Sequence, residues 1–247
     1  MINVAVLGAS GRMGGNVVRA VDAAEDLAMV AALDMGDEIA AAARAGAQVA
    51  VDFTVPTASE QNVHALIEAG IHAVVGTSGW TQDALLRVEE HLKERPELGV
   101  LVAPNFALGA VLAMRLSAAA SKYFESVEII ELHHPDKVDA PSGTAVHTAA
   151  GIAAARAAAG VGPSPDATTH DPDHARGALV HGVRVHAVRL RGLVAHEEIL
   201  MGNPGEQFTI RHDSFDRASF MPGVLLGVRQ IDRHPGLTLG LEHFMDL

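Results

Sequence analysis

The chain has 247 residues, a formal net charge of −12 and no cysteine. The acidic balance argues against nucleic-acid binding, which needs a basic face, and the lack of cysteine excludes disulfides, thiol catalysis and thiolate metal sites. No apolar run approaches the length of a membrane span, and the N-terminus has no basic leader of the kind that begins a secretory signal. We therefore expect a cytoplasmic protein with no nucleic-acid or membrane partner, and with one or two domains.

The first hundred residues alternate between short apolar runs and Ala-rich or amphipathic stretches. The apolar runs predict buried strands, and the stretches between them predict helices. This alternation indicates βαβ units, in which helices cover both faces of a parallel sheet. The predicted strands are 2–8, 28–34, 47–53, 71–77 and 98–104, and the predicted helices are 11–24, 57–70 and 81–92.

The pattern changes after residue 106. Three later segments alternate apolar and polar residues between Gly-containing turns, which predicts antiparallel strands. The predicted elements are a helix at 107–124, a strand at 126–134, a helix at 144–159, a loop at 160–178, strands at 183–192, 193–202 and 206–213, and a helix at 219–232. The sequence thus predicts an α/β protein with two domains. Residues 1–106, completed by 216–247, form a Rossmann-like domain, and 107–215 form a smaller α+β domain with a mixed or antiparallel sheet.

A glycine-rich turn, VLGASGRMG, joins the first predicted strand to the first predicted helix. Gly8, Gly11 and Gly14 allow a tight turn and a close backbone approach to a pyrophosphate, which a helix N-terminus can bind. Asp34 follows Gly14 by about 20 residues and ends the second strand, where an acid accepts ribose hydroxyls. An ordinary glycine turn and a solvated aspartate are the alternatives. Together the features favour a dinucleotide site.

Two further strand ends, GTSG at 76–79 and APNFA at 103–107, contain small residues that leave room for a nicotinamide and its ribose. Ligands of open α/β sheets bind beyond the carboxyl ends of the strands, although ordinary tight turns are the alternative here. Met35 stands where an arginine could bind a 2′-phosphate, while Arg12 in the glycine loop could still do so. The sequence therefore does not choose between NADH and NADPH.

The stretch IELHHPDKVDAPSGTA, residues 130–145, concentrates polar chemistry directly after an apolar run. His133 and His134 point to opposite faces of a regular strand, and Lys137 follows three residues later. Histidine titrates near neutrality, and lysine can be tuned to donate a proton, which suits proton transfer to a carbanion or enamine. Histidines that only fill space are the alternative. A zinc site lacks support from cysteine or an HExxH motif, so no metal is expected.

The helix that follows this stretch is predicted to begin with a capped N-terminus. Ser142 is the expected N-cap, and the free backbone N–H groups of Gly143 and Thr144 then form an anion site suited to a carboxylate. A capped helix without a ligand is the alternative. The remaining histidines of this half are expected to be structural or exposed: His181, His186, His196 and His212.

Six segments together resemble the dihydrodipicolinate reductases, also named 4-hydroxy-tetrahydrodipicolinate reductases. The segments are VLGASGRMG, VDFT, VVGTSGW, APNFALGAV, ELHHPDKVDAPSGTA and RHDSFDRASFMPGVL. They extend from the first strand to the tail, and the ELHHxxKxDAPSGTA block is the most specific. The short length and the segment HAVRLRGLVAHEEILMG resemble the actinobacterial branch of the family.

The resemblance implies hydride transfer from NADH or NADPH to a cyclic imine with two carboxylates, within diaminopimelate and lysine biosynthesis. It implies a homotetramer formed through the sheet of the second domain. It also implies that His133 donates or accepts a proton, that Lys137 donates one, and that His134, Gly143 and Thr144 hold the substrate carboxylates. The implied cofactor-binding residues are Gly8, Ala9, Ser10, Gly11, Arg12, Met13, Asp34, Gly76, Thr77, Ser78, Ala103, Pro104, Asn105 and Phe106. Many relatives have threonine at position 78, where this chain keeps the hydroxyl as serine.

Two other functions are compatible with the same motifs. A nicotinamide-dependent amino-acid dehydrogenase would share the dinucleotide site, but the paired histidines and the Ser-Gly-Thr turn exceed what one carboxylate needs. A non-catalytic nucleotide-binding sensor would leave Lys137 without a role. The reductase is therefore the leading hypothesis.

Overall fold

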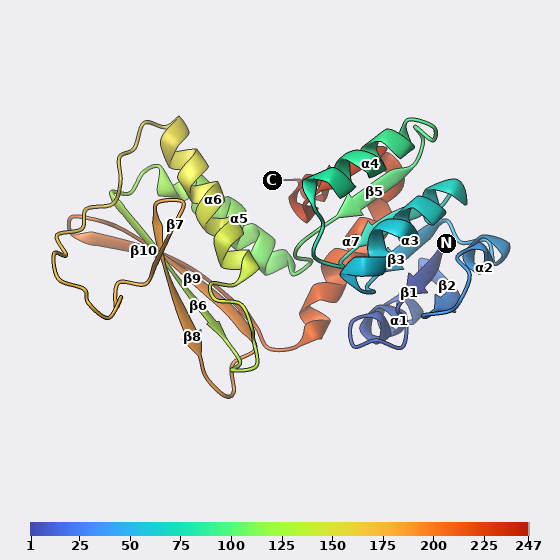
Figure 1. The fold of residues 1–247 in the computed structure, drawn as a ribbon, viewed down its shortest axis with the longest axis horizontal. Helices are drawn as coiled ribbons and strands as arrows, with labels where there is room; N and C mark the ends of the chain where they lie inside the picture. Colours follow the sequence, from blue (N-terminus) through green and yellow to red (C-terminus); the bar gives the residue numbers. More distant parts are fainter. Residues whose placement is uncertain (247) are drawn as a thin grey trace. The chain divides into compact units, whose positions relative to one another are not determined.

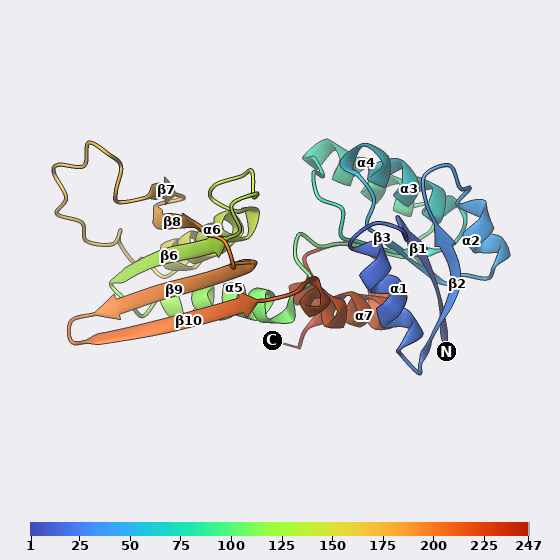
Figure 2. The ribbon, with the colours of Figure 1, turned by 90° about the horizontal axis from the view of Figure 1, so that it is seen from below.

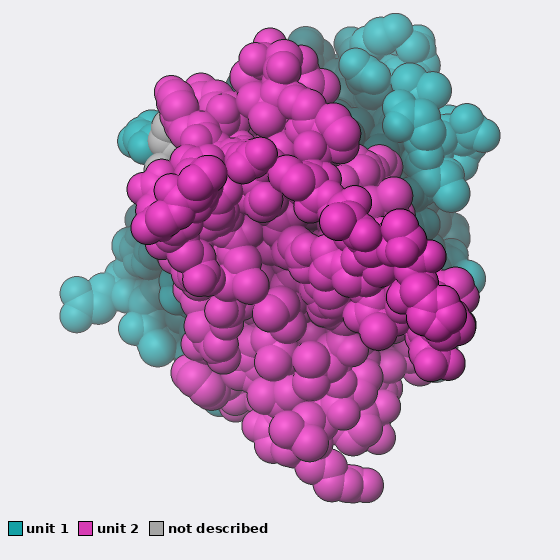
Figure 3. Space-filling view, turned by 90° about the vertical axis from the view of Figure 1, so that its left-hand side faces the viewer, with its two compact units in different colours: residues 1–107, 217–247 teal, residues 108–216 magenta. Residues whose placement is uncertain are grey.

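The computed structural model describes residues 1–246 and consists of two compact units (Figures 1 and 3). Unit 1 contains Met1–Ala107 and Arg217–Leu247, and unit 2 contains Leu108–Asp216. The chain thus leaves unit 1 once, builds unit 2 from one continuous segment, and returns to complete unit 1.

Unit 1 is built on a six-stranded sheet in which all strands run parallel, in the order β11-β5-β4-β3-β1-β2. Strands β3 and β5 are buried along their whole length, as expected when helices cover both faces of a sheet. The strands are β1 (Ile2–Leu7), β2 (Leu27–Leu33), β3 (Val49–Asp52), β4 (His72–Val75), β5 (Gly99–Val102) and β11 (Gly236–Leu239). The parallel α/β architecture predicted from the sequence is confirmed.

Helices pack on both faces of this sheet. Helices α3 and α4 contact each other on one face, and α1 and α7 contact each other on the other (Figure 2). The helices are α1 (Gly14–Asp22), α2 (Ala40–Arg44), α3 (Pro56–Glu68), α4 (Gln82–Leu92) and α7 (Met221–Gln230). Short 3₁₀ turns surround α7 and follow β11: η1 (Arg217–Phe220), η2 (Ile231–Arg233) and η3 (Leu241–Phe244).

The predicted tail helix is shorter than expected, and the strand after it was not predicted. Helix α7 is flanked by the turns η1 and η2, and β11 then pairs with β5 at the edge of the sheet. Residues 236–239 of β11 are a short apolar run bounded by glycine, which has too few residues to show a periodicity. These residues are identified as a strand only by their hydrogen-bonded pairing with β5.

Unit 2 has a five-stranded mixed sheet in the order β10-β9-β6-β8-β7, with two helices packed on one face (Figure 1). Residues from the helices and the inward side of the central strands share one core. The strands are β6 (Ser126–His133), β7 (Ala178–Val180), β8 (Val183–Arg189), β9 (Ala195–Asn203) and β10 (Glu206–Ser214), and the helices are α5 (Leu108–Ser121) and α6 (Gly143–Ala158). No helix within residues 1–246 is long and apolar enough to cross a membrane.

The mixed sheet agrees with the prediction, but the sequence did not predict which strands are neighbours. Strands β8 and β9 are consecutive in the chain but are not neighbours, because β6 lies between them. Strand β8 runs parallel to β6, whereas β9 runs antiparallel to it. Alternation of apolar residues tells which side chains face the core, but it does not tell which strand is adjacent.

Strand β7 lies at the edge of the predicted loop and pairs antiparallel with β8. The two-residue turn between them contains His181 and Gly182, both with positive φ angles of 50° and 85°. Two positive φ angles are the geometry of a tight hairpin turn whose twist matches the strands. The sequence VHGV therefore closes a hairpin that its short apolar run did not reveal.

A buried arginine joins the end of α6 to the end of α5. Arg156 is only 6% exposed, and burial lowers the pKa of its guanidinium. It donates hydrogen bonds to the backbone oxygens of Ser121, Phe124, Glu125 and Gly162, at donor–acceptor distances of 2.7 to 3.0 Å. These bonds satisfy carbonyls at the end of α5 and in the loop after α6, which would otherwise be buried without donors.

Candidate functional site

A cleft of about 750 Å³ lies in unit 1 at the carboxyl ends of β1, β2, β3 and β4. This is the edge of an open α/β sheet where ligands bind. Nine of the expected cofactor-binding residues line it: Gly8, Ser10, Gly11, Arg12, Met13, Asp34, Gly76, Thr77 and Ser78. The expected residues Ala9 and 103–106 are not among its lining residues, and of these Ala103 and Phe106 are buried.

Glycine is required at two positions of the loop between β1 and α1. Gly8 has a φ angle of 77°, and a Cβ there would lie 2.6 Å from the carbonyl oxygen of Phe53. A Cβ on Gly14 would lie 2.0 Å from the carbonyl oxygen of Gly8. The first turn of α1 is therefore pressed against the end of β1, beside the cleft that Gly8, Gly11 and Met13 line.

Asp34 lies directly after β2 and contacts the glycine loop. Its carboxylate accepts the backbone N–H of Ser10 at 3.1 and 3.2 Å, and its own N–H donates to Asp37 Oδ2 at 2.8 Å. Met35 is fully exposed beside it. Arg12 is exposed in the loop and has no ion-pair partner in the part of the chain that the structure describes. The cleft thus offers carboxylate oxygens and one unpaired guanidinium.

The sequence reasoning missed Asp52, the last residue of β3, although its segment VDFT carried part of the resemblance. Asp52 is fully buried, and its carboxylate accepts hydrogen bonds from neutral donors. The donors are the N–H and hydroxyl of Thr54 at 2.9 and 2.7 Å, the hydroxyls of Thr77 at 2.7 Å and Ser59 at 3.2 Å, and the amide of Asn62 at 3.1 Å. Asp52 therefore ties the loop after β3 to the end of β4, both of which line the cleft.

The aromatic ring of Phe53 lines the same cleft. A Cβ on Gly76 would lie 2.0 Å from the ring of Phe53, so glycine is needed there for the ring to pack against the backbone. The Phe53 ring lies 5.9 Å from that of Phe106, centroid to centroid. The expected segment 103–106 thus reaches the cleft through this aromatic contact.

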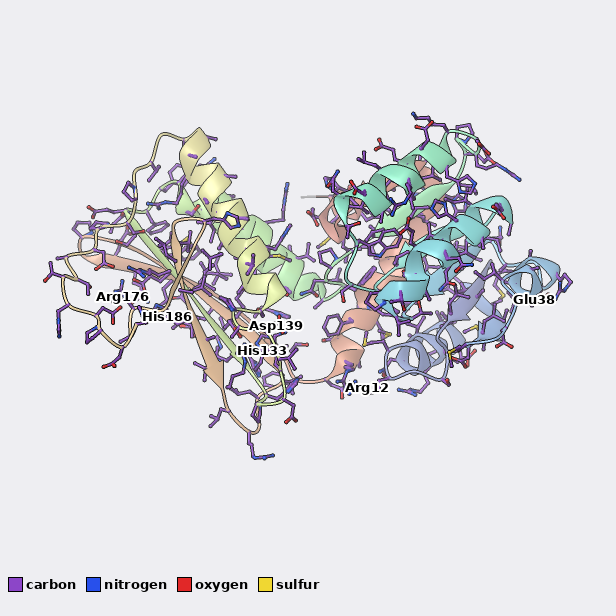
Figure 4. The ribbon with its side chains drawn as sticks, in the orientation of Figure 1. Arg12, Glu38, His133, Asp139, Arg176 and His186 are labelled. Carbon is purple, nitrogen blue, oxygen red and sulfur yellow. The ribbon has the colours of Figure 1, made fainter. Side chains whose placement is uncertain are left out.

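In unit 2 the polar stretch gathers at the end of β6 and the start of α6. His133 ends β6, and its Nδ1 lies 2.5 Å from Oε2 of Glu131 (Figure 4). Arg189 of β8 donates two hydrogen bonds to the Glu131 carboxylate at 2.7 and 2.8 Å, and the N–H of Ser142 donates a third at 3.1 Å. Burial raises the pKa of Glu131, but the hydrogen bonds from His133 and Arg189 outweigh it and hold the pKa at about 2.

The remaining expected residues lie close by in sequence. Lys137 is mostly buried, and its Nζ lies 2.7 Å from Oδ1 of Asp139, which lowers the pKa of that carboxyl. Ser142 caps α6 as predicted, because its hydroxyl accepts the N–H of Ala145 at 3.2 Å. Gly143 is the first residue of α6 and is exposed. The exposed start of this helix is its positive dipole end, which favours an anion.

A second buried carboxyl lies beside Glu131. Glu197 of β9 is directly opposite Glu131 in the antiparallel register and is only 5% exposed. Its Oε2 accepts the hydroxyl of Thr148 at 3.0 Å, while its Oε1 has no hydrogen-bond partner among residues 1–246. Burial raises the pKa of Glu197 to about 7, and the nearby charge of Glu131 acts in the same direction. Neither this residue nor Glu131 and Arg189 were identified from the sequence.

The other histidines are structural or exposed, as predicted. His196 is buried and lies 2.7 Å from Asp213, and His186 lies 2.7 Å from Glu128. His181 is exposed in the β7–β8 turn. The ring of His212 packs against Gly109 of α5, so closely that a Cβ on this glycine would lie 2.5 Å from the ring. Within residues 1–246 no group of three or more histidine or acidic side chains is arranged to hold a metal ion.

Comparison with known proteins identifies the family. The model of the dihydrodipicolinate reductase N-terminus matches residues 2–106, and that of the C-terminus matches residues 109–245. The chain belongs to the dihydrodipicolinate reductase family. The 4-hydroxy-tetrahydrodipicolinate reductase of Beutenbergia cavernae is 66% identical over 100% of this chain and 99% of that protein, and the one of Streptomyces griseus subsp. griseus is 58% identical over 100% and 98%. The resemblance to the actinobacterial branch is confirmed.

Solved structures agree with this assignment. The dipicolinate-bound dihydrodipicolinate reductase from Paenisporosarcina sp. TG-14 has a TM-score of 0.88 and 36% identity, covering 99% of this chain and 100% of that one. The amine dehydrogenase from Mycobacterium smegmatis has a TM-score of 0.62 at 11% identity, covering 96% and 94%. The second similarity shows a shared fold alone.

Proposed function

We propose that this protein reduces 4-hydroxy-tetrahydrodipicolinate to tetrahydrodipicolinate by hydride transfer from NADH or NADPH, a step of diaminopimelate and lysine biosynthesis. The similarity to reductases of that name over the whole chain carries the proposal. The cleft of unit 1 and the polar cluster at the end of β6 support it, because the reaction needs a dinucleotide site and groups that bind a dianion.

We assign dinucleotide binding to unit 1. The cleft is large enough, the glycine loop brings the N-terminus of α1 and its positive dipole end beside it for a pyrophosphate, and Asp34 offers oxygens to ribose hydroxyls. The small residues at 76–78 and the segment 103–106 would flank the nicotinamide, which supplies the hydride when the cofactor is bound. Ala9 and Met13 belong to the same loop and would contact the cofactor through their backbone.

The choice of cofactor depends on opposing charges. Asp34 and Asp37 place carboxylates beyond β2 that repel a 2′-phosphate, whereas Arg12 carries an unpaired positive charge that attracts one. We therefore expect both cofactors to be used. Arg12→Ala should lower kcat/KM for NADPH several-fold more than for NADH, and equal losses would remove Arg12 from phosphate binding.

We assign substrate binding and proton transfer to unit 2. His134 and the N-terminus of α6 at Gly143 and Thr144 would bind the two carboxylates, because cationic groups and helix N-termini favour anions. His133 would donate or accept a proton, and Lys137 would donate one to the carbon that becomes electron-rich after hydride transfer. Asp139 keeps the ammonium of Lys137 in place at 2.7 Å.

The test is a steady-state assay with freshly prepared substrate, which follows the absorbance of NADH or NADPH. Lys137→Ala should lower kcat on the order of 10²-fold, as expected for the loss of a general acid. Lys122→Ala, which removes an exposed lysine of the same unit, should leave kcat unchanged. Failure of the wild-type protein to oxidise either cofactor would contradict the proposal.

Two alternatives predict different results in the same assay. A non-catalytic sensor would bind a cofactor without turnover. An amino-acid dehydrogenase would oxidise an amino acid and resist pyridine-2,6-dicarboxylate, whereas the reductase should be inhibited by this planar dianion. The fold shared with the amine dehydrogenase does not favour that alternative, because similarity at 11% identity carries no information about the substrate.

A homotetramer assembled through the sheet of unit 2 is also proposed. Helices α5 and α6 pack on one face of this sheet, whereas the opposite face exposes side chains such as Leu179, which is 63% exposed. Analytical ultracentrifugation should give four times the chain mass of 25.8 kDa. A monomer would contradict this proposal without affecting the assigned reaction. A cytoplasmic location stays a prediction.

A further inference from the structure

We propose that Glu131, held by Arg189, is the positioning residue for His133. It accepts the Nδ1–H of the imidazole and thereby leaves Nε2 as the nitrogen that exchanges a proton with the substrate. This inference rests on the proposed function, because the role of His133 in proton transfer belongs to that proposal.

The geometry around Glu131 is that of a fixed acceptor. Glu131 lies on β6, the central strand of the sheet, and is 0% exposed. Arg189 contacts both carboxylate oxygens from β8, and the N–H of Ser142 contacts Oε1, so the carboxylate cannot rotate without breaking three hydrogen bonds. His133 Nδ1 lies 2.5 Å from Oε2, while Nε2 has no hydrogen-bond partner among the described residues.

Arg189 determines what this acceptor does to the imidazole. A lone buried carboxylate would attract a proton or force a positive charge onto the histidine beside it. The guanidinium compensates the charge of Glu131, which stays ionised. The pair therefore accepts a hydrogen bond from Nδ1–H without requiring that His133 be protonated at both nitrogens, and this selects one neutral tautomer.

The groups packed around the pair are compatible with this role. Glu197 of β9 lies directly opposite Glu131, and Thr148 of α6 donates a hydrogen bond to it. Asp139 contributes its backbone oxygen to Arg189 at 2.8 Å, so the guanidinium is held from the loop as well. Among the described residues, Arg189 and His133 are the only basic side chains that contact the Glu131 carboxylate.

A matched arrangement on the same strand provides a control. Glu128 of β6, on the opposite face of the sheet, lies 2.5 Å from Arg176 and 2.7 Å from Nε2 of His186 (Figure 4). It is the same Arg–Glu–His set, but its glutamate is 29% exposed and its histidine has no assigned role in the reaction. Loss of the carboxylate there removes an equivalent set of ion pairs without touching His133.

The first experiment compares Glu131→Gln with Glu128→Gln. We expect Glu131→Gln to lower kcat roughly 10- to 100-fold, as for other groups that orient a reacting histidine, with KM values for substrate and cofactor within twofold of wild type. Glu128→Gln should leave kcat unchanged. A wild-type kcat in Glu131→Gln, or a loss confined to KM, would overturn the proposal.

The second experiment distinguishes positioning from a general structural effect. In a His133→Gln background, Glu131→Gln should cause less than a twofold further loss of kcat, because its effect passes through the imidazole. If Glu131→Gln lowers kcat by the same factor in the His133→Gln background as in the wild-type protein, the proposal is overturned. If Glu131→Gln alone does not fold, the variant Glu131→Gln with Arg189→Gln removes both buried charges and should show the same loss and the same non-additivity.

A measurement without turnover separates this proposal from the proposed function. Nitrogen-15 shifts of the His133 ring, assigned with His133→Gln, should report the Nδ1–H tautomer in the wild-type protein and a tautomer mixture in Glu131→Gln. A mixture in the wild-type protein would overturn the positioning role. An inactive wild-type protein with a single Nδ1–H tautomer would contradict the proposed function and leave the positioning intact.

Discussion

The free energy of unfolding of the wild-type protein should fall as the pH rises toward 7, because Glu197 ionises. In the variant Glu197→Gln this fall should be absent. Glu197 is 5% exposed, its Oε1 has no hydrogen-bond partner, and Glu131 lies directly across the sheet from it. Glutamine has nearly the same shape as protonated glutamic acid and can still accept the hydrogen bond from Thr148. The substitution therefore tests the ionisation of this carboxyl rather than its packing.

The expected magnitude follows from the two pKa values. Burial raises the pKa of Glu197 from 4.5 to about 7 in the folded protein. Below pH 4.5 both states hold the proton, so ionisation contributes nothing. Between pH 4.5 and 7 the unfolded chain releases its proton first, and the free energy of unfolding falls with pH. Above pH 7 the loss is complete, at about 3 kcal/mol for a difference of this size.

Urea unfolding from pH 5 to pH 8 measures this effect. The difference in unfolding free energy between Glu197→Gln and the wild-type protein should increase by about 2.5 kcal/mol over that range in favour of the variant, because part of the loss has already occurred by pH 5. Asp166→Asn is a matched control in the same unit. Hydrogen bonds from Thr168 lower the pKa of Asp166 to about 2, so its difference from wild type should stay constant above pH 5. Parallel curves for Glu197→Gln and wild type would refute the reasoning.

Three further substitutions test the packing of the two units by urea unfolding. Gly14→Ala forces a Cβ to 2.0 Å from the carbonyl oxygen of Gly8 and should lower the free energy of unfolding by on the order of 2 kcal/mol. Gly162→Ala, with open space around it, should cost little, and equal losses for the two variants would contradict the close approach. Arg156→Met leaves four carbonyls without their donor and should cost about 3 kcal/mol, and a cost below about 1 kcal/mol would show that other donors replace it. Asp52→Asn places an NH₂ group among hydrogen-bond donors, so it should lower the free energy of unfolding by about 2 kcal/mol and weaken dinucleotide binding measured by calorimetry. A fully stable variant with unchanged affinity would show that Asp52 does not support the cleft.

Most elements of unit 1 could be predicted because their signals are local. A buried parallel strand is a short apolar run, and the glycine loop requires residues that tolerate close backbone approach. The cap at Ser142 was also predictable, because its hydroxyl accepts the N–H of Ala145, only three residues further along the chain. The edge strand β11 was missed, since its four residues carry no periodicity of their own.

The polar partners of the candidate site could be predicted only in part. The ELHHxxKxDAPSGTA block predicts proton transfer for His133 and Lys137, but nothing in the sequence distinguishes Glu131 from the other polar residues of an alternating strand. Its partner Arg189 lies 58 residues further along the chain. The alternation shows that both side chains face inward, but it does not show that β8 lies next to β6.

The sequence by itself determined the α/β class, the glycine loop and the family, because each depends on motifs that are contiguous in the chain. It also predicted the residues that are assigned to the proposed reaction. Only the tertiary structure decided the strand order of unit 2, the pairing of Glu131 with Arg189, and the neighbouring position of Glu197. These features depend on which strands become neighbours, and a residue's ionisation depends on the distant groups that surround it after folding. The hydrogen bonds that keep Glu131 charged, and the burial that raises the pKa of Glu197, are therefore properties of the folded sheet.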